Sequence, residues 1–114
     1  MREYLIKGQK GKKTWGTLYY SDKRNSFRIK FRSDIDFQKE HPPAYIHRFM
    51  TNGRTEIDGE LAWMWVTDRI IPKDRQNIDT ILKEAGLKCY REIDMLELCM
   101  GRCTYDDMYL ERVR

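Results

Sequence analysis

The alternation of apolar and polar residues is clearest between residues 26 and 32, which read SFRIKFR. In an extended segment, Phe27, Ile29 and Phe31 lie on one face and the basic residues between them lie on the other. Period-two alternation of this kind is typical of a strand with one buried and one solvated face. We therefore predict a strand over residues 26–32 whose basic side chains stand about 7 Å apart on the exposed face.

Two earlier segments also favour strands. Residues 3–8 and 14–21 carry Thr, Tyr, Trp, Ile and Leu, which suit a pleated and half-buried surface. Residues 22–25 read Asp-Lys-Arg-Asn, a composition typical of a hairpin turn. Together with the alternating segment, these features predict an antiparallel β-meander over residues 3–32.

The chain that follows the meander is harder to interpret. His41-Pro42-Pro43 interrupts any regular element, and residues 44–50 suit either a strand or one helical turn. Asn52-Gly53 is a turn signal. We expect a hairpin that joins residues 44–51 to 54–58.

The most apolar stretch runs from Leu61 to Thr67 and contains Trp63 and Trp65. We favour a short helix here because a capped helical region follows, and a buried strand is the alternative. The two tryptophans diverge on a helix and face opposite sides of a strand, so we expect one in the core and the other available as an anchor for a partner.

A longer helix is predicted over residues 73–85. Pro72 fits its first turn, and Gly86 stands where a left-handed C-terminal cap belongs. The apolar residues on one face of this helix follow helical spacing: Ile78, Ile81, Leu82 and Ala85.

The last third of the chain predicts a further helix over residues 92–100, ended by Gly101, and a final strand within residues 104–113. The whole pattern indicates a single α+β domain, in which an antiparallel meander packs against a C-terminal half with two to three helices. Residues 1–60 are expected to be mainly β, and residues 61–114 mainly helical.

Charge is distributed unevenly along the 114 residues. Residues 1–33 contain ten Lys or Arg and two acids, whereas residues 34–114 contain twelve Lys or Arg and sixteen acids. A basic N-terminal third of this kind favours a polyanionic partner, and an ordinary solvated sheet face is the alternative. Aromatic side chains lie among these cations, a combination that suits RNA phosphates and stacked bases. The candidate nucleic-acid-binding residues are Lys10, Lys12, Lys13, Trp15, Tyr19, Lys23, Arg24, Arg28, Lys30 and Arg32.

No catalytic or metal-binding pattern stands out. The three cysteines are odd in number and have no C-x-x-C spacing, so we expect free thiols and a cytoplasmic protein without a cofactor. His41 and His47 have no partners at a metal-ligand spacing, and we expect them to have loop or packing roles. Asp106-Asp107 could contribute to a metal-dependent nuclease site, the last-ranked alternative. No segment is apolar over the roughly 20 residues of a membrane span, and no membrane partner is expected.

The C-terminal half resembles the accessory module that precedes the kinase-like domain in HipA-like proteins of Gram-positive bacteria and mobile elements. The resemblance rests on an aromatic before Arg69-Ile70-Ile71-Pro72, then Arg75, Ala85-Gly86-Leu87, Gly101, Asp106-Asp107 and Tyr109. The glycine-rich loop, catalytic loop and magnesium motif of a kinase are missing, so the resemblance carries no kinase activity to this chain. It implies a bacterial or phage setting and a binding role. The residues assigned to partner binding are Trp63, Trp65, Arg69 and Arg75.

The sequence thus leads to a first hypothesis of a non-enzymatic binding or regulatory protein of a bacterial mobile element. Such a protein would act on RNA, DNA or a nucleic-acid-bound host protein, for example as an anti-CRISPR-type inhibitor. The second hypothesis is a protein-binding component or remnant of a HipA-like toxin–antitoxin system. The oligomeric state is left open.

Overall fold

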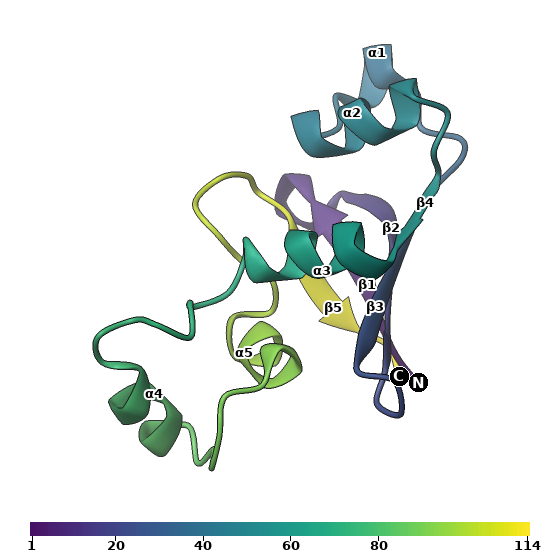
Figure 1. Cartoon of the computed structure of the whole chain (residues 1–114). Helices are drawn as coiled ribbons and strands as arrows, with labels where there is room; N and C mark the ends of the chain where they lie inside the picture. Colours follow the sequence, from purple (N-terminus) through teal and green to yellow (C-terminus); the bar gives the residue numbers. More distant parts are fainter.

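The predicted meander is present in the computed structural model, which describes all residues 1–114. Strands β1 (Arg2–Gly8), β2 (Lys13–Ser21) and β3 (Ser26–Phe31) pair antiparallel in chain order. Two short strands extend this sheet, β4 (Glu56–Asp58) beside β3 and β5 (Tyr109–Arg112) beside β1. The result is a five-stranded antiparallel sheet with the order β4-β3-β2-β1-β5 (Figure 1).

The helices are short and distributed unevenly around the sheet. They are the 3₁₀ turn η1 (Gln9–Gly11) and α1 (Phe37–Glu40), α2 (Ala44–Thr51), α3 (Gly59–Thr67), α4 (Ile78–Glu84) and α5 (Glu92–Cys99). Figure 1 shows α3 and α5 beside the sheet, α1 and α2 beyond one end of it, and α4 at the edge of the molecule. None of these helices combines the length and the apolarity needed to cross a bilayer.

The core lies between one face of the sheet and helices α3 and α5. The strands contribute alternate residues to this face, which confirms the predicted burial of Phe27, Ile29 and Phe31. The helices contribute Ala62, Trp65, Val66, Ile93, Met95 and Leu96. Burial of each large apolar side chain contributes about 1.5–3 kcal/mol to folding. The strands and helices share one core cluster, so its burial stabilises the packing of the helices against the sheet.

The predicted hairpin of residues 44–51 with 54–58 is wrong. Residues 44–51 form helix α2, which buries Ile46, and Asn52-Gly53 follows the end of this helix instead of joining two strands. Strand β4 then pairs with β3, whose edge the meander leaves open. Pro43 suits the N-terminal end of a helix, and this start favours α2 over an extended segment.

The helix predicted over residues 73–85 begins later, at Ile78. Before it, the Arg75 N–H donates to the Pro72 carbonyl oxygen and the Ile78 N–H donates to the Arg75 carbonyl oxygen, so two turns replace the first helical turns. The end of the helix agrees with the prediction, because Gly86 adopts a left-handed conformation with φ of 74°.

Candidate functional site

The open face of the sheet, which no helix covers, carries similar numbers of cations and carboxylates. Its outward-facing cations are Lys7, Arg28 and Lys30, and its carboxylates are Glu3, Glu56, Asp58 and Glu111. The acidic strand β4 causes this balance, because Arg28 pairs in register with Asp58 and Lys30 pairs with Glu56. Arg28 Nη1 also lies 3.4 Å from Glu56 Oε1. The basic row that the sequence predicts on this face is therefore largely neutralised.

Arg32 and Lys13 are held by one carboxylate. Arg32 Nη2 lies 2.6 Å and Lys13 Nζ 3.2 Å from Glu40 Oε1. The Arg32 guanidinium, followed by the Asp36 backbone N–H, lowers the pKa of Glu40 to about 2. Both cations are thus engaged inside the protein, and the row of Arg28, Lys30 and Arg32 does not continue past the end of β3.

The predicted aromatic residues of the nucleic-acid site are also engaged. Trp15 has no exposed surface, so it cannot stack on a base. The ring of Tyr19 lies beneath the Arg28 guanidinium, 4.7 Å from the ring centroid to Cζ. The remaining cations are exposed and fall into two groups at opposite ends of β2: Lys10 with Lys12, and Lys23 with Arg24. The structure therefore does not bring the predicted nucleic-acid-binding residues together on one surface.

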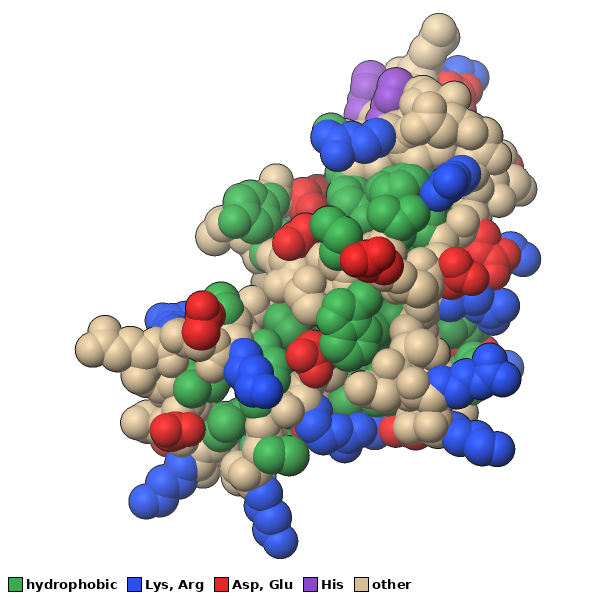
Figure 2. All heavy atoms as spheres, viewed as in Figure 1, with side chains coloured by type: hydrophobic (Ala, Val, Ile, Leu, Met, Phe, Trp, Pro, Cys, Tyr) green, Lys and Arg blue, Asp and Glu red, His purple; other side chains and the backbone are tan.

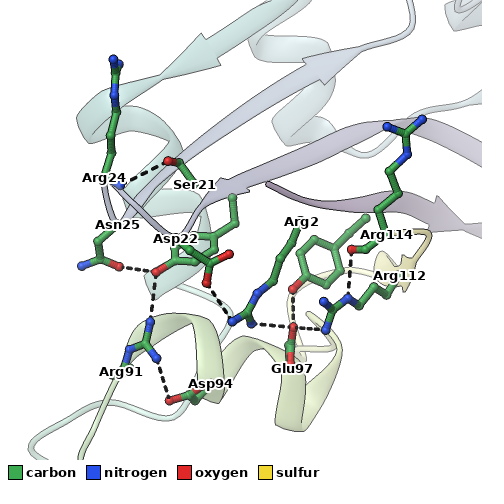
Figure 3. Close-up of polar contacts among 12 residues, drawn as sticks. Arg2, Ser21, Asp22, Arg24, Asn25, Arg91, Asp94, Glu97, Arg112 and Arg114 are labelled. Carbon is green, nitrogen blue, oxygen red and sulfur yellow. Dashed lines mark hydrogen bonds and ion pairs between the residues drawn. The ribbon is translucent and has the colours of Figure 1, made fainter.

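A second concentration of positive charge lies where β1, β5, α5 and the β2–β3 turn meet (Figure 3). We name it the arginine cluster: Arg2, Arg24, Arg91, Arg112 and Arg114. Around it stand four carboxylates: Glu3, Asp22, Asp94 and Glu97. Figure 2 shows Lys and Arg side chains at the lower right, around the sheet end where both chain ends lie in Figure 1.

Glu97 organises the arginine cluster. Its Oε1 lies 3.0 Å from Arg2 Nη1 and 3.0 Å from Arg112 Nη1, and it accepts a hydrogen bond from the buried hydroxyl of Tyr4. Burial, followed by this carboxylate, raises the pKa of Tyr4. Arg24 and Arg114 point away from Glu97 in Figure 3. Arg24 has no side-chain partner, and Arg114, which is 74% exposed, lies 3.7 Å from Glu3 Oε1, so both guanidinium groups are accessible to an external anion.

The four residues predicted to bind a partner have different environments. Trp65 is 2% exposed, and Trp63 is half-buried with its ring centroid 5.5 Å from that of Phe27. Neither tryptophan is free to serve as a fully exposed anchor. Arg75 is exposed and without a side-chain partner, whereas Arg69 is buried.

Arg69 joins α3 to the segment before β5. Its Nε donates to the Gly101 carbonyl oxygen at 2.6 Å, and Nη2 donates to the Met108 carbonyl oxygen at 3.1 Å. Both terminal nitrogens donate to the carboxylate of Asp106, at 2.9 and 2.5 Å. The guanidinium also stacks on Trp65, with 4.5 Å between Cζ and the ring centroid. Arg69 is therefore held by contacts inside the protein, and its predicted contact with a partner stays a prediction.

A pocket of about 430 Å³ opens beside this arginine, between the start of α2, the end of α3 and the segment before β5. Its lining residues are Pro43, Ala44, Tyr45, Trp65, Asp68, Arg69, Cys103, Tyr105 and Asp106. Asp68 is exposed and has no ion-pair or side-chain hydrogen-bond partner. Burial, followed by the Asp68 carboxylate, raises the pKa of Tyr45 to about 12. We name this hollow the α2–α3 pocket.

Apolar side chains are exposed or half-buried on the elements that form the α2–α3 pocket. Met64 is 52% exposed and Leu61 37% exposed on the outer side of α3, and Tyr105 is 83% exposed on the loop. On α2 the rings of Tyr45 and Phe49 lie 4.9 Å apart. Figure 2 shows hydrophobic side chains gathered between α2 and α3 in the upper half of the view. These five residues form what we call the apolar face.

The histidines and cysteines do not assemble with other candidate groups. His47 packs edge-on against Phe37, with ring centroids 4.9 Å apart, and all three cysteines are free thiols. No three of the His, Cys, Asp and Glu side chains lie close enough together to hold a metal ion.

The chain matches no family model, no curated protein and no solved structure. The resemblance of its C-terminal half to HipA-like accessory modules therefore stays a prediction. The apolar face was missed from sequence, although one signal was present. Helix α3 is apolar on its outer positions Leu61 and Met64 as well as on its buried side, and such a helix needs a second surface to contact.

Proposed function

We propose that this chain is a non-enzymatic binding protein that docks a partner protein on its apolar face. The observation that carries the proposal is the outer side of α3, where Leu61 and Met64 are exposed although the opposite side of the same helix fills the core. Methionine and aromatic side chains are enriched at protein interfaces, and an apolar patch on a small protein marks a contact site.

The partner that fits the sequence is a bacterial kinase-like protein of the HipA type. The resemblance of residues after Trp65 to the module in front of such kinases supports this choice. An accessory module without kinase motifs of its own would act by binding. The free thiols are compatible with a cytoplasmic setting in a bacterium or its mobile element.

Capture experiments test this proposal. We expect the tagged protein to retain a HipA-like kinase from a bacterial lysate, identified by mass spectrometry. The double change Leu61→Asp with Met64→Asp should reduce recovery at least about tenfold, since charged groups at the centre of an apolar interface are left unpaired.

The matched control is Leu98→Asp, which places the same charge at another exposed leucine, 49% exposed on α5. This control should leave recovery unchanged. Equal recovery by the double variant and the parent protein would contradict the proposal, as would recovery of no kinase-like protein at all.

Nucleic-acid binding is a second candidate function, and the arginine cluster is the observation that favours it. Arginine donates bidentate hydrogen bonds to phosphate, and Arg24 and Arg114 are exposed at the same end of the sheet (Figure 3). In this proposal the phosphates of RNA or DNA contact the end of the sheet and not its charge-balanced open face.

Salt-dependent binding tests the second candidate. With a fluorescent RNA of about 20 nucleotides, Arg24→Glu with Arg114→Glu should lower affinity about tenfold and reduce the salt dependence by about one per arginine. The control Lys10→Glu with Lys12→Glu alters exposed cations at the opposite end of β2 and should leave affinity within about twofold. A larger loss from the control pair than from the cluster pair would contradict this assignment.

A further inference from the structure

The α2–α3 pocket holds an unbalanced negative charge. It contains one cation, Arg69, whose charge is matched by the two-pronged contact with Asp106. Asp68 then remains as a carboxylate without a partner in the same pocket. The residues that line the pocket therefore carry a net charge of −1, and more than half of them are apolar or aromatic.

The position of Asp68 strengthens its attraction for a cation. Asp68 is the C-cap residue of the nine-residue helix α3, next to the last carbonyl groups of the helix. The C-terminal end of a helix carries a partial negative charge, so a carboxylate there is unfavourable and a cation is favourable. Local stability alone would favour a neutral or basic residue at this position.

Aromatic side chains belong to the lining of the same pocket. Tyr45, Trp65 and Tyr105 line it, and Trp65 already stacks against the Arg69 guanidinium at 4.5 Å. Tyr105 is 83% exposed and Tyr45 is half-buried, and neither ring is covered by a cation. Aromatic faces beside a carboxylate are the surroundings that attract an organic cation.

We propose that the α2–α3 pocket binds the guanidinium group of an arginine side chain from the partner protein. A guanidinium is planar, stacks on aromatic rings and forms two parallel hydrogen bonds with a carboxylate, whereas an ammonium is a compact and strongly hydrated charge. Leu61 and Met64 of the apolar face precede Asp68 at helical spacing on α3, so an interface on that side of the helix would bring such a side chain to Asp68. The inference thus rests on the proposed docking function and adds the chemistry of the partner's anchor.

The test uses a model peptide, an N-acetylated and C-amidated Gly-Arg-Gly, followed by NMR on the intact protein. We expect it to shift the indole N–H signal of Trp65, which lines the pocket and has no hydrogen-bond partner. The matching citrulline peptide has the same shape without the charge and should bind at least about tenfold more weakly. A lysine peptide should also bind more weakly than the arginine peptide.

Asp68→Asn tests the carboxylate. We expect about tenfold weaker binding of the arginine peptide together with a higher melting temperature, because the change removes an unpaired charge from the C-terminal end of α3. Asp74→Asn makes the same substitution at an exposed position outside the pocket and should leave peptide binding unchanged. A purely structural role for Asp68 would not combine a gain in stability with a loss of binding.

Equal binding of the arginine and citrulline peptides, or unchanged binding by the Asp68→Asn variant, would overturn the inference. Lysine binding as tight as arginine binding would overturn the assignment of a guanidinium. The capture experiment separates this failure from a failure of the docking proposal. Suppose that Leu61→Asp with Met64→Asp still abolishes capture but that the arginine and citrulline peptides bind equally. The docking proposal is then supported, and the proposed arginine contact is rejected.

Discussion

Replacing Arg69 by Met is expected to lower the free energy of unfolding by about 3–5 kcal/mol, the cost of leaving one member of a buried ion pair without its partner. The Arg69 side chain is 5% exposed and satisfies the Gly101 and Met108 carbonyl oxygens as well as Asp106. Methionine fills similar space but offers no donor, so three acceptors lose their hydrogen bonds. Urea unfolding followed by tryptophan fluorescence measures the loss.

Arg75→Ala is the matched control, since Arg75 belongs to the same segment but is exposed and has no side-chain partner. It should change the free energy of unfolding by no more than about 0.5 kcal/mol. Because a domain of this kind has only about 5–15 kcal/mol of stability, the Arg69 variant can be largely unfolded. Adding Asp106→Leu to Arg69→Met should then restore part of the stability, as apolar replacements of whole buried pairs do. Equal stability of the Arg69→Met variant and the parent protein would contradict this role.

Gly16→Ala should destabilise the protein by about 3 kcal/mol or more, at the upper end of overpacking effects. A Cβ atom at Gly16 would lie 2.4 Å from the Lys30 carbonyl oxygen and 2.8 Å from Phe31 Cα, in the backbone of the neighbouring strand. Backbone atoms of a paired strand cannot rotate away as a side chain can. Strands β2 and β3 must therefore separate where Gly16 pairs with Phe31, and thermal unfolding should show the loss.

Gly53→Ala separates this clash from the general effect of losing a glycine. Gly53 has φ of 78°, and a Cβ atom added there would have no other atom within 4 Å, so only backbone strain of about 1–2 kcal/mol is expected. A Gly16 variant that is as stable as the Gly53 variant would show that the sheet relaxes around the added methyl group.

Local patterns in the sequence were sufficient for the meander, because the alternation at Phe27, Ile29 and Phe31 reports directly which face is buried. They failed where one short signal fits two structures. Asn52-Gly53 ends a helix as readily as it joins two strands, and Pro72 starts a turn as readily as a helix. In both cases contacts from elsewhere in the chain decided the outcome.

Long-range pairing was the main obstacle to predicting the candidate sites. The basic face was predicted from Arg28 and Lys30, but its neutralisation depends on Glu56 and Asp58 of a strand that follows two helices. Similarly, nothing near Arg69 in the sequence identifies Asp106 as its partner. A single sequence does not tell whether a charged residue interacts with solvent, with another side chain or with a ligand.

The pairing of β1 with β5 has a consequence for synthesis on the ribosome. Tyr4 pairs with Arg112, so one edge of β1 stays unpaired until the residues between them have been made. At typical rates of translation this interval is roughly 5–20 s. An open strand edge can pair with other nascent chains, and contacts of such long sequence separation slow folding. The meander can form early, but its outer edge stays open until residues 109–112 have emerged.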